Sequence, residues 1–162
     1  MKKFPLLIAL TTIIISCGEN NNAPKQAETL ANTTTSTSEE IILSSDDNMR
    51  FDKKEIKLKE GQQVKLTLKH TGKMPKSAMG HNFVLLKNDV DFAALTAILA
   101  QATPPEYHFP EAARKDVIVY SDMIGGGEST SVTFTAPAKG IYRFICSFPG
   151  HYAMMQGTVI VE

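Results

Sequence analysis

The residues with the clearest chemistry lie near the end of the chain, in the run Cys146-x4-His151-x3-Met155. This stretch offers a thiol, an imidazole and a thioether, and a second imidazole, His81, lies far upstream. A thiolate, two imidazoles and a weak axial thioether form the ligand set of redox-active copper sites, whereas zinc sites are built from Cys, His and carboxylates. The residues therefore indicate copper and one-electron transfer rather than hydrolysis.

Each of these residues also has a plainer interpretation. Cys146 alone would read as a buried core cysteine, the histidines as ordinary surface or hydrogen-bonded residues, and Met155 as core filler in a chain with seven methionines. Met154 competes with Met155 for the axial position, and spacing alone does not decide between them. A catalytic Cys146–His151 pair would need an orienting acid or amide, and the intervening residues offer no candidate.

Alternating apolar and polar residues predict short strands that would position these ligands. Seven such segments are found, at 56–58, 64–68, 83–86, 117–120, 131–135, 141–145 and 158–161. Residues 91–101 instead repeat apolar residues at helical spacing, with Asp89 or Asp91 as the N-cap and Pro104-Pro105 ending the helix. The pattern predicts an all-β protein, a Greek-key β-sandwich of seven to eight strands with one helical excursion.

The N-terminus resembles an export signal. Lys2 and Lys3 precede an apolar run that is too short to span a bilayer and that ends at Ser16-Cys17. This arrangement resembles a bacterial lipobox, so residues 1–16 are predicted to be a signal peptide and Cys17 a lipidated first residue; the alternative is a plain secretory peptide with an unmodified cysteine. Lipid on Cys17 would leave Cys146 as the only free thiol, with no intramolecular disulfide possible, although the compartment is oxidising.

Residues 17–40 contain few apolar side chains and are rich in Asn, Thr and Ser, so they are predicted to be a flexible tether before one domain at 41–162. The full sequence has 17 basic and 17 acidic side chains. Removal of the signal deletes Lys2 and Lys3 but no acidic residue, which leaves a net charge of about −2. Nucleic acid is not an expected partner, because its binding requires a basic stripe.

The domain resembles azurin, the bacterial blue-copper branch of the cupredoxins. The resemblance covers residues 41–162 and includes the Cys146 to Met155 spacing, which is longer between Cys and His than in plastocyanin-like members. The other matching motifs are Met49-x-Phe51, Leu68-x-His70-x-Gly72, Pro75-x-x-x-Met79-Gly80-His81-Asn82 and Ile124-Gly-x-Gly-Glu128-x-x-Ser131-Val132-Thr133-Phe134.

The resemblance implies a role for each matched position. It implies His81, Cys146 and His151 as equatorial ligands of one type 1 copper ion, Met155 as the axial thioether, and the carbonyl of Gly80 as a weak fifth contact. Asn82 would hydrogen-bond across to the ligand loop, and Phe148 would direct its backbone N–H at the sulfur, both tuning the potential. An apolar docking patch would surround the exposed edge of His151, and its methionines would be Met49, Met74, Met79 and Met154.

The remaining histidines are less informative. His70 matches a histidine that azurins carry near the copper, where it would either titrate and couple to the potential or be a satisfied buried histidine. His108 has no counterpart and is expected on the surface. The chain also lacks the usual azurin disulfide and any tryptophan, with Phe83 in the place of a buried one, and residues 88–115 form a longer excursion.

Taken together, the sequence predicts a membrane-tethered blue copper protein, not an enzyme, in the periplasm or on the cell surface. It would act as a monomer and pass single electrons between redox proteins such as c-type cytochromes or a copper reductase or oxidase. The lipid on Cys17 would hold it at a membrane and raise its effective concentration near membrane-bound partners. The alternative is a lipoprotein that binds and delivers copper, which requires a labile, weakly coloured site.

Overall fold

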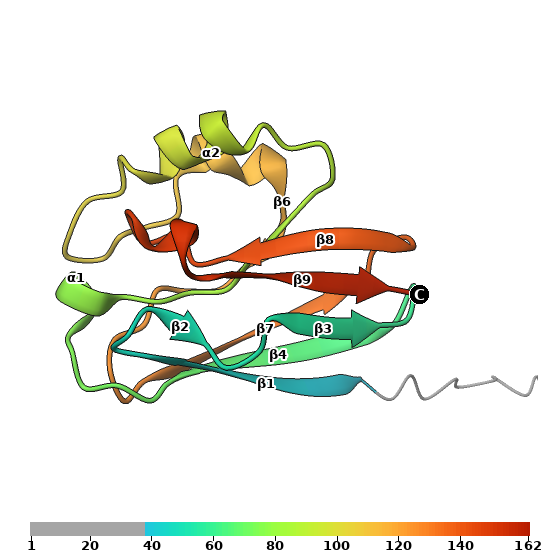
Figure 1. The fold of residues 1–162 in the computed structure, drawn as a ribbon, viewed down its shortest axis with the longest axis horizontal. Coiled ribbons are helices and arrows are strands. Elements are labelled where there is room, and N and C mark those ends of the chain that lie inside the picture. The colour runs from blue at the N-terminus through green and yellow to red at the C-terminus, as the bar shows by residue number, and fades with distance from the viewer. Residues whose placement is uncertain (1–37) are drawn as a thin grey trace, which may run out of the picture. The chain divides into compact units, whose positions relative to one another are not determined.

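The computed structural model describes residues 38–162, which fold into two β-sheets packed face to face (Figure 1). The predicted signal peptide, Cys17 and nearly all of the predicted tether lie outside the described residues. One sheet has the strand order β2-β1-β4-β7, formed by β1 (Glu39–Asp46), β2 (Arg50–Phe51), β4 (Gln63–His70) and β7 (Ser129–Thr135). The other has the order β3-β9-β8-β5-β6, formed by β3 (Glu55–Leu58), β5 (Val84–Leu86), β6 (Val117–Tyr120), β8 (Gly140–Ile145) and β9 (Gln156–Val161).

The predicted β-sandwich is confirmed, and all seven predicted segments form strands. Both sheets are mixed, because β1 pairs parallel to β4 and β3 pairs parallel to β9, while the other pairings are antiparallel. The sequence pattern did not reveal β1 and β2, which bring the described strands to nine. Since β1 begins at Glu39, the domain starts two residues before the predicted boundary at 41.

Strand β4 shows how the alternating pattern builds the sandwich. Val64, Leu66 and Leu68 are at most 1% exposed, whereas Lys65 on the opposite face is exposed and pairs with Glu40. Alternate side chains of a strand point to opposite sides, so one face of β4 enters the space between the sheets. These residues belong to a main core that also includes Phe83, Leu85, Phe134, Phe144, Cys146, Phe148 and Met155.

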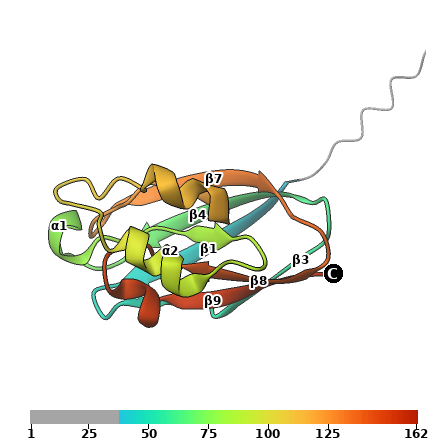
Figure 2. The ribbon, with the colours of Figure 1, turned by 90° about the horizontal axis from the view of Figure 1, so that it is seen from above.

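Strand β5 separates this main core from a second apolar cluster. Phe83 and Leu85 pack in the main core, while Val84 and Leu86 point to the opposite side of the sheet. There they meet Leu95 and Leu99 of α2 (Phe92–Leu99), with the further members Ala113, Val117 and Ile145. We call this second group the outer cluster. Figure 2 shows α2 and the 3-10 helix η1 (Glu111–Asp116) lying over the sheet.

The predicted helix at 91–101 is confirmed as α2. The Asp91 carboxylate caps it by accepting a hydrogen bond of 3.1 Å from the N–H of Ala94. The helix ends at Leu99, before Pro104. Three short helical segments were not predicted: α1 (Lys76–Met79), η1 and η2 (His151–Ala153). Among residues 38–162, no helix is long and apolar enough to cross a membrane.

Candidate metal centre

The proposed ligands come from segments that backbone hydrogen bonds hold at one end of the sandwich. His81 exchanges two backbone hydrogen bonds of 2.9 Å with Ile124. Cys146 follows β8 directly, and its N–H donates to the carbonyl of Met155, which precedes β9, over 2.9 Å. Met155 in turn donates its N–H to the carbonyl of His151 over 2.8 Å. The loop is therefore closed at both ends and tied across its middle.

Gly150 makes the tight return of this loop possible. Its φ of +85° lies in the left-handed region, and no heavy atom outside its chain neighbours would contact an added Cβ. The requirement for glycine here is consequently conformational rather than steric. The turn places His151 as the first residue of η2, with its side chain directed back toward Cys146.

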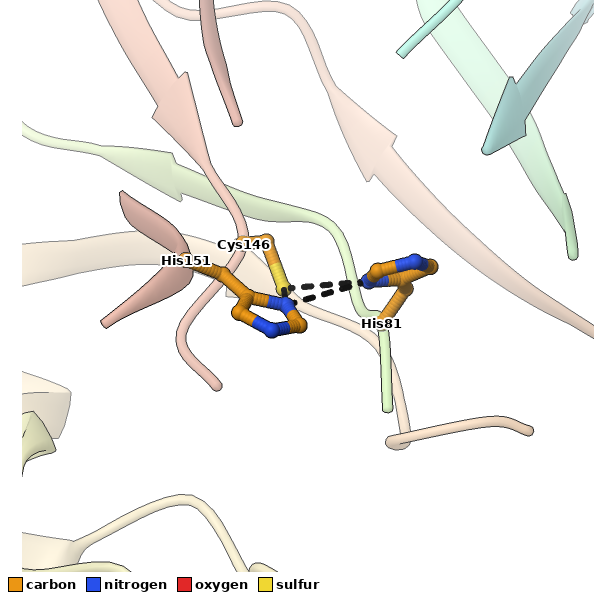
Figure 3. A group of neighbouring side chains, drawn as sticks. All are labelled: His81, Cys146 and His151. Carbon is orange, nitrogen blue, oxygen red and sulfur yellow. Dashed lines mark hydrogen bonds between the residues drawn. The ribbon is translucent and has the colours of Figure 1, made fainter. Parts of the chain in front are cut away.

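Three donor atoms converge at this end of the sandwich (Figure 3). Cys146 Sγ lies 3.9 Å from the Nδ1 atoms of both His81 and His151, and these two nitrogens are 3.3 Å apart. The point equidistant from the three atoms lies about 2.2 Å from each, close to the roughly 2.0–2.3 Å bonds that imidazole nitrogen and thiolate sulfur make to first-row metal ions. The arrangement therefore fits one metal ion without rearrangement of the side chains.

The orientation of His81 is set by a main-chain oxygen. Its Nε2 lies 3.0 Å from the carbonyl oxygen of Asp46, at the end of β1. A carbonyl oxygen can only accept, so Nε2 carries the hydrogen and Nδ1 keeps a free lone pair. That lone pair is the one that faces Cys146. A hydrogen bond on the outer nitrogen of a histidine is the usual way in which proteins fix a ligand's tautomer.

Burial keeps all three groups uncharged when no metal ion is bound. The side chains of His81 and Cys146 are fully buried, and His151 is 5% exposed. Burial lowers the pKa of His81 and of His151 to about 4, so both rings are neutral at physiological pH. Burial raises the pKa of the Cys146 thiol to about 12, against the opposing effect of backbone N–H groups from Asn82 and Phe148. Without a metal ion the site thus holds a thiol and two neutral imidazoles.

The structure separates the two methionines that competed for the axial position. Met155 is fully buried in the main core and is joined to Cys146 and His151 by its backbone, whereas Met154 is 58% exposed. Gly80 also lies at the site, with its carbonyl oxygen 3.7 Å from Cys146 Sγ. A Cβ on Gly80 would approach Phe148 Cδ2 to 2.9 Å, so only glycine permits this close contact.

Asn82, which precedes β5, hydrogen-bonds to the ligand loop. Its Oδ1 accepts hydrogen bonds from the backbone N–H of Ser147, over 2.8 Å, and from the Ser147 hydroxyl, over 3.1 Å. Its Nδ2 donates to the Ser147 hydroxyl over 2.9 Å. The backbone N–H groups of Asn82 and Phe148 also interact with the Cys146 thiol and oppose the rise of its pKa. The resemblance implied only the one from Phe148.

The predicted docking methionines differ in exposure. Met154 and Met74 are 58% and 39% exposed, while Met49 and Met79 are half-buried. The ammonium group of Lys54 donates hydrogen bonds of 3.2 Å to the carbonyl oxygens of Met154 and Gln156.

His70 is a buried histidine in contact with the site. Its Nε2 lies 2.9 Å from the Met79 carbonyl oxygen, and its Nδ1 accepts from the N–H of Gly72 over 3.0 Å. Its ring stacks on His81 at a centroid distance of 4.4 Å. Both ring nitrogens thus have hydrogen-bond partners, and the ring packs against one face of the proposed ligand His81. His108 is exposed.

Sequence reasoning missed contributions that come from the main chain or from distant side chains. The Asp46 carbonyl acts through its backbone, so its side chain gave no signal. Ser121, which is buried and accepts a hydrogen bond from the N–H of Phe83 over 3.0 Å, follows a predicted strand without any distinguishing spacing. Ser147 was not singled out either, although it directly follows Cys146 in the sequence.

The chain resembles copper proteins along the whole described domain. Residues 39–162 match the family of copper-binding proteins described as plastocyanin/azurin. Azurin-2 of Alcaligenes xylosoxydans xylosoxydans is 44% identical over 119 residues, covering 71% of this chain and 91% of that protein. Outer membrane protein H.8 of Neisseria gonorrhoeae is 43% identical over 120 residues, which cover 71% of this chain and 63% of that protein, so the chain spans less than two thirds of this relative.

Solved structures agree with the sequence relatives. Auracyanin A, a "blue" copper protein from Chloroflexus aurantiacus, superimposes with a TM-score of 0.67 at 32% identity, covering 77% of this chain and 99% of that one. Copper is the metal that the family description names, and the gathered thiol and two imidazoles suit a single type 1 copper ion. The chain belongs to the plastocyanin/azurin family of copper-binding proteins.

Proposed function

We propose that this protein is a blue copper electron carrier that is held at a membrane by an N-terminal lipid. The observation that carries the proposal is the buried triangle of Cys146 Sγ and the Nδ1 atoms of His81 and His151, with edges of 3.3 to 3.9 Å. When bound there, copper supplies one-electron cycling between Cu(II) and Cu(I). The remaining question is what the chain's own residues contribute to that cycle.

In this proposal each residue at the site has a separate role. His81, Cys146 and His151 would hold the ion through their nitrogen and sulfur atoms, Met155 would add its thioether sulfur, and the Gly80 carbonyl would lie near the ion as a weak contact. The backbone N–H groups of Asn82 and Phe148, which interact with the sulfur, would stabilise the more electron-rich reduced state and so raise the potential.

Rigidity is the second contribution of the protein. His81 is fixed at its backbone by Ile124, at its Nε2 by Asp46, and on its ring face by His70. The Cys146 and Met155 backbones are bonded to each other. Ligands held on both sides cannot rearrange much when the oxidation state changes, and a small rearrangement keeps the barrier to electron exchange low. This rigidity supports a carrier over a delivery protein, whose ligands must release the ion.

A carrier also needs no open position for a substrate. The four proposed ligand side chains are buried, each 5% exposed or less. A surface cleft of about 540 Å³ lies beside the site, but none of these four residues lines it. This geometry supports electron exchange through the protein edge rather than turnover of a bound molecule.

Electrons would enter and leave through His151, and partners would dock on the apolar patch formed by Met49, Met74, Met79 and Met154. The Lys54 ammonium group at the backbone of Met154 adds positive charge at its edge, which suits redox partners with acidic residues. Such partners are c-type cytochromes or copper reductases and oxidases. The H.8 relative is named an outer membrane protein, which supports a periplasmic or surface location. The lipobox-like Ser16-Cys17 supports anchoring of a monomeric protein by lipid.

The proposal is tested with residues 17–162 carrying Cys17→Ser, which cannot be lipidated at that position. After addition of one equivalent of Cu(II), we expect an intense blue absorption and a narrow copper hyperfine splitting in the EPR spectrum. Both should disappear in the further variant Cys146→Ser. A pale solution with wide splitting would contradict the carrier and favour copper delivery.

Anchoring has its own test in the full chain. Expression with labelled palmitate should label the wild type and not Cys17→Ser, and the wild type should sediment with membranes. An unlabelled but exported wild-type protein would identify the N-terminus as a plain secretory signal.

A further inference from the structure

We propose that Tyr107 is a positioning residue for the copper site, one that holds Phe148 against Cys146 and His151 and separates the site from the neighbouring cleft. The inference rests on the proposed function and adds a residue to it from a different part of the chain. Tyr107 lies in the excursion between α2 and η1, far in sequence from the ligand loop. Its predicted effect is on the reduction potential.

A row of three aromatic rings leads from Tyr107 to a proposed ligand. The rings of Tyr107 and Phe148 have centroids 4.5 Å apart, and those of Phe148 and His151 are 4.3 Å apart. Phe148 is only 8% exposed. Tyr107 therefore touches the ring that touches His151, without approaching the metal position itself.

Phe148 is the residue through which Tyr107 would act. Its backbone N–H interacts with the Cys146 thiol and lowers the pKa of that group, against the effect of burial. Its ring packs so closely on Gly80 that a Cβ there would lie 2.9 Å from Cδ2. Gly80 and His151 thus limit the movement of the ring from within the site. Tyr107 supplies a contact from the excursion, and its loss would leave Phe148 free to shift away from the sulfur.

Tyr107 is itself held firmly at this place. Its hydroxyl donates to the carbonyl oxygen of Ser77 over 3.1 Å, and its N–H donates to that of Thr103 over 3.0 Å. The preceding Glu106 forms an ion pair with Lys76 of α1. The backbone of Tyr107 has a φ of +49°, a left-handed conformation that is costly for a bulky residue and persists only where its surroundings enforce it. The excursion is thus fastened to α1, and its strained residue is the one that meets Phe148.

Tyr107 also forms a wall of the cleft of about 540 Å³ beside the site. Asn82 and Met123 line the same cleft, whereas Phe148 does not. Since Tyr107 contacts the cleft and packs on Phe148, removal of its side chain would extend the cleft to Phe148. Water would then approach the sulfur, and the N–H of Phe148 would be less well directed. Both changes favour the more highly charged oxidised site, so both lower the potential.

The test compares reduction potentials of residues 17–162 carrying Cys17→Ser, with and without Tyr107→Ala. We expect Tyr107→Ala to shift the ratio of Cu(I) to Cu(II) affinity about tenfold toward Cu(II), which is a fall of about 59 mV for a one-electron couple. Tyr107→Phe keeps the ring on Phe148 and should retain the parental potential. If Tyr107→Ala fails to fold, Tyr107→Leu removes the aromatic ring and hydroxyl while keeping apolar bulk.

The matched control is Phe109→Ala, in the same excursion. Phe109 is also a half-buried aromatic residue, but it stacks on Tyr120, at 4.2 Å, and not on Phe148. We expect it to leave the potential almost unchanged. An unchanged potential in copper-loaded Tyr107→Ala, or an equal fall in Phe109→Ala, would overturn the inference while the parent protein remained blue. A parent protein that is not blue would instead overturn the proposed function.

Discussion

The main core and the outer cluster lie on opposite sides of β5 and differ in what they contain. The main core encloses Cys146 and Met155 and borders both proposed histidine ligands. The outer cluster consists only of hydrocarbon side chains, such as Leu95, Leu99 and Ile145. Ile145 belongs to the outer cluster although it directly precedes Cys146, because successive residues of a strand face opposite sides. One sheet thus separates the chemistry from a purely structural support.

This difference predicts that mutations on the two sides of the sheet will have separate consequences. A cavity in the main core should reduce stability and also disturb the copper site. A cavity of similar cost in the outer cluster should reduce stability and leave the copper spectrum unchanged.

Phe144→Ala should have the largest effect. Phe144 is fully buried, packs on Phe51 and Phe83 at centroid distances of 5.5 Å, and fills the space above Gly157. Removing a buried phenylalanine side chain costs about 3–5 kcal/mol, which urea unfolding of the copper-free protein would measure. Because Cys146 lies two residues further along the chain and its side chain also belongs to the main core, we also expect a shift of the blue absorption band. An unchanged band would show that the ligand loop is independent of the main core.

Leu95→Ala is the matched change on the other side of the sheet. Leu95 is fully buried in the outer cluster, and its truncation should cost about 2–5 kcal/mol. The blue band and the EPR splitting of the folded, copper-loaded variant should equal those of the parent. A spectral change as large as that of Phe144→Ala would contradict the separation of the two sides.

The limits of sequence prediction follow the same division. Local alternation was sufficient to predict β4 from the sequence, because polar and aliphatic residues follow one another regularly there. It was insufficient for β1, whose short apolar stretch Ile41–Leu43 is flanked by polar residues and which becomes a strand through parallel pairing with β4, from Glu39–Val64 to Ser45–His70. Such pairing joins distant segments and leaves no local pattern.

The candidate site divides in a similar way. The ligand types and the spacing of Cys146, His151 and Met155 carried the copper prediction because the chemistry lies in the side chains. The support from Asp46 and the N–H of Asn82 lies in the main chain, which any residue type provides. The contact of Tyr107 with Phe148 depends on how a long excursion folds back. Only the three-dimensional structure reveals these contributions.

The two sides should also differ in their response to pH, since only the main core contains the buried ionisable groups of the site. The pKa of the Cys146 thiol is raised to about 12, and the pKa values of His81 and His151 are lowered to about 4. Across the physiological pH range the metal-free site therefore keeps the thiol proton, while both imidazoles are neutral. Because Cys146 binds copper as a thiolate, copper binding releases that proton. The apparent affinity should therefore rise about tenfold, or about 1.4 kcal/mol, for each pH unit.

Chelator competition between about pH 6 and pH 8 would measure this slope. Below about pH 4 the slope should steepen, because His81 and His151 then bind protons as well. The variant Leu95→Ala serves as the control and should retain the same slope. An affinity that does not change with pH would mean that the thiol is already ionised in the metal-free protein.

Asp91→Ala should have the smallest effect. It tests the end of α2, the helix that contributes Leu95 and Leu99 to the outer cluster. The Asp91 carboxylate caps α2 through the N–H of Ala94, and loss of such a cap costs about 1 kcal/mol. Asp91→Ser retains a capping oxygen and should recover most of this loss in urea unfolding. Since α2 meets the sheet through the outer cluster, the reduction potential should be the same in both variants. A change of potential in Asp91→Ala alone would show that α2 transmits strain through β5 to the ligands, and that the hydrocarbon side takes part in tuning the copper.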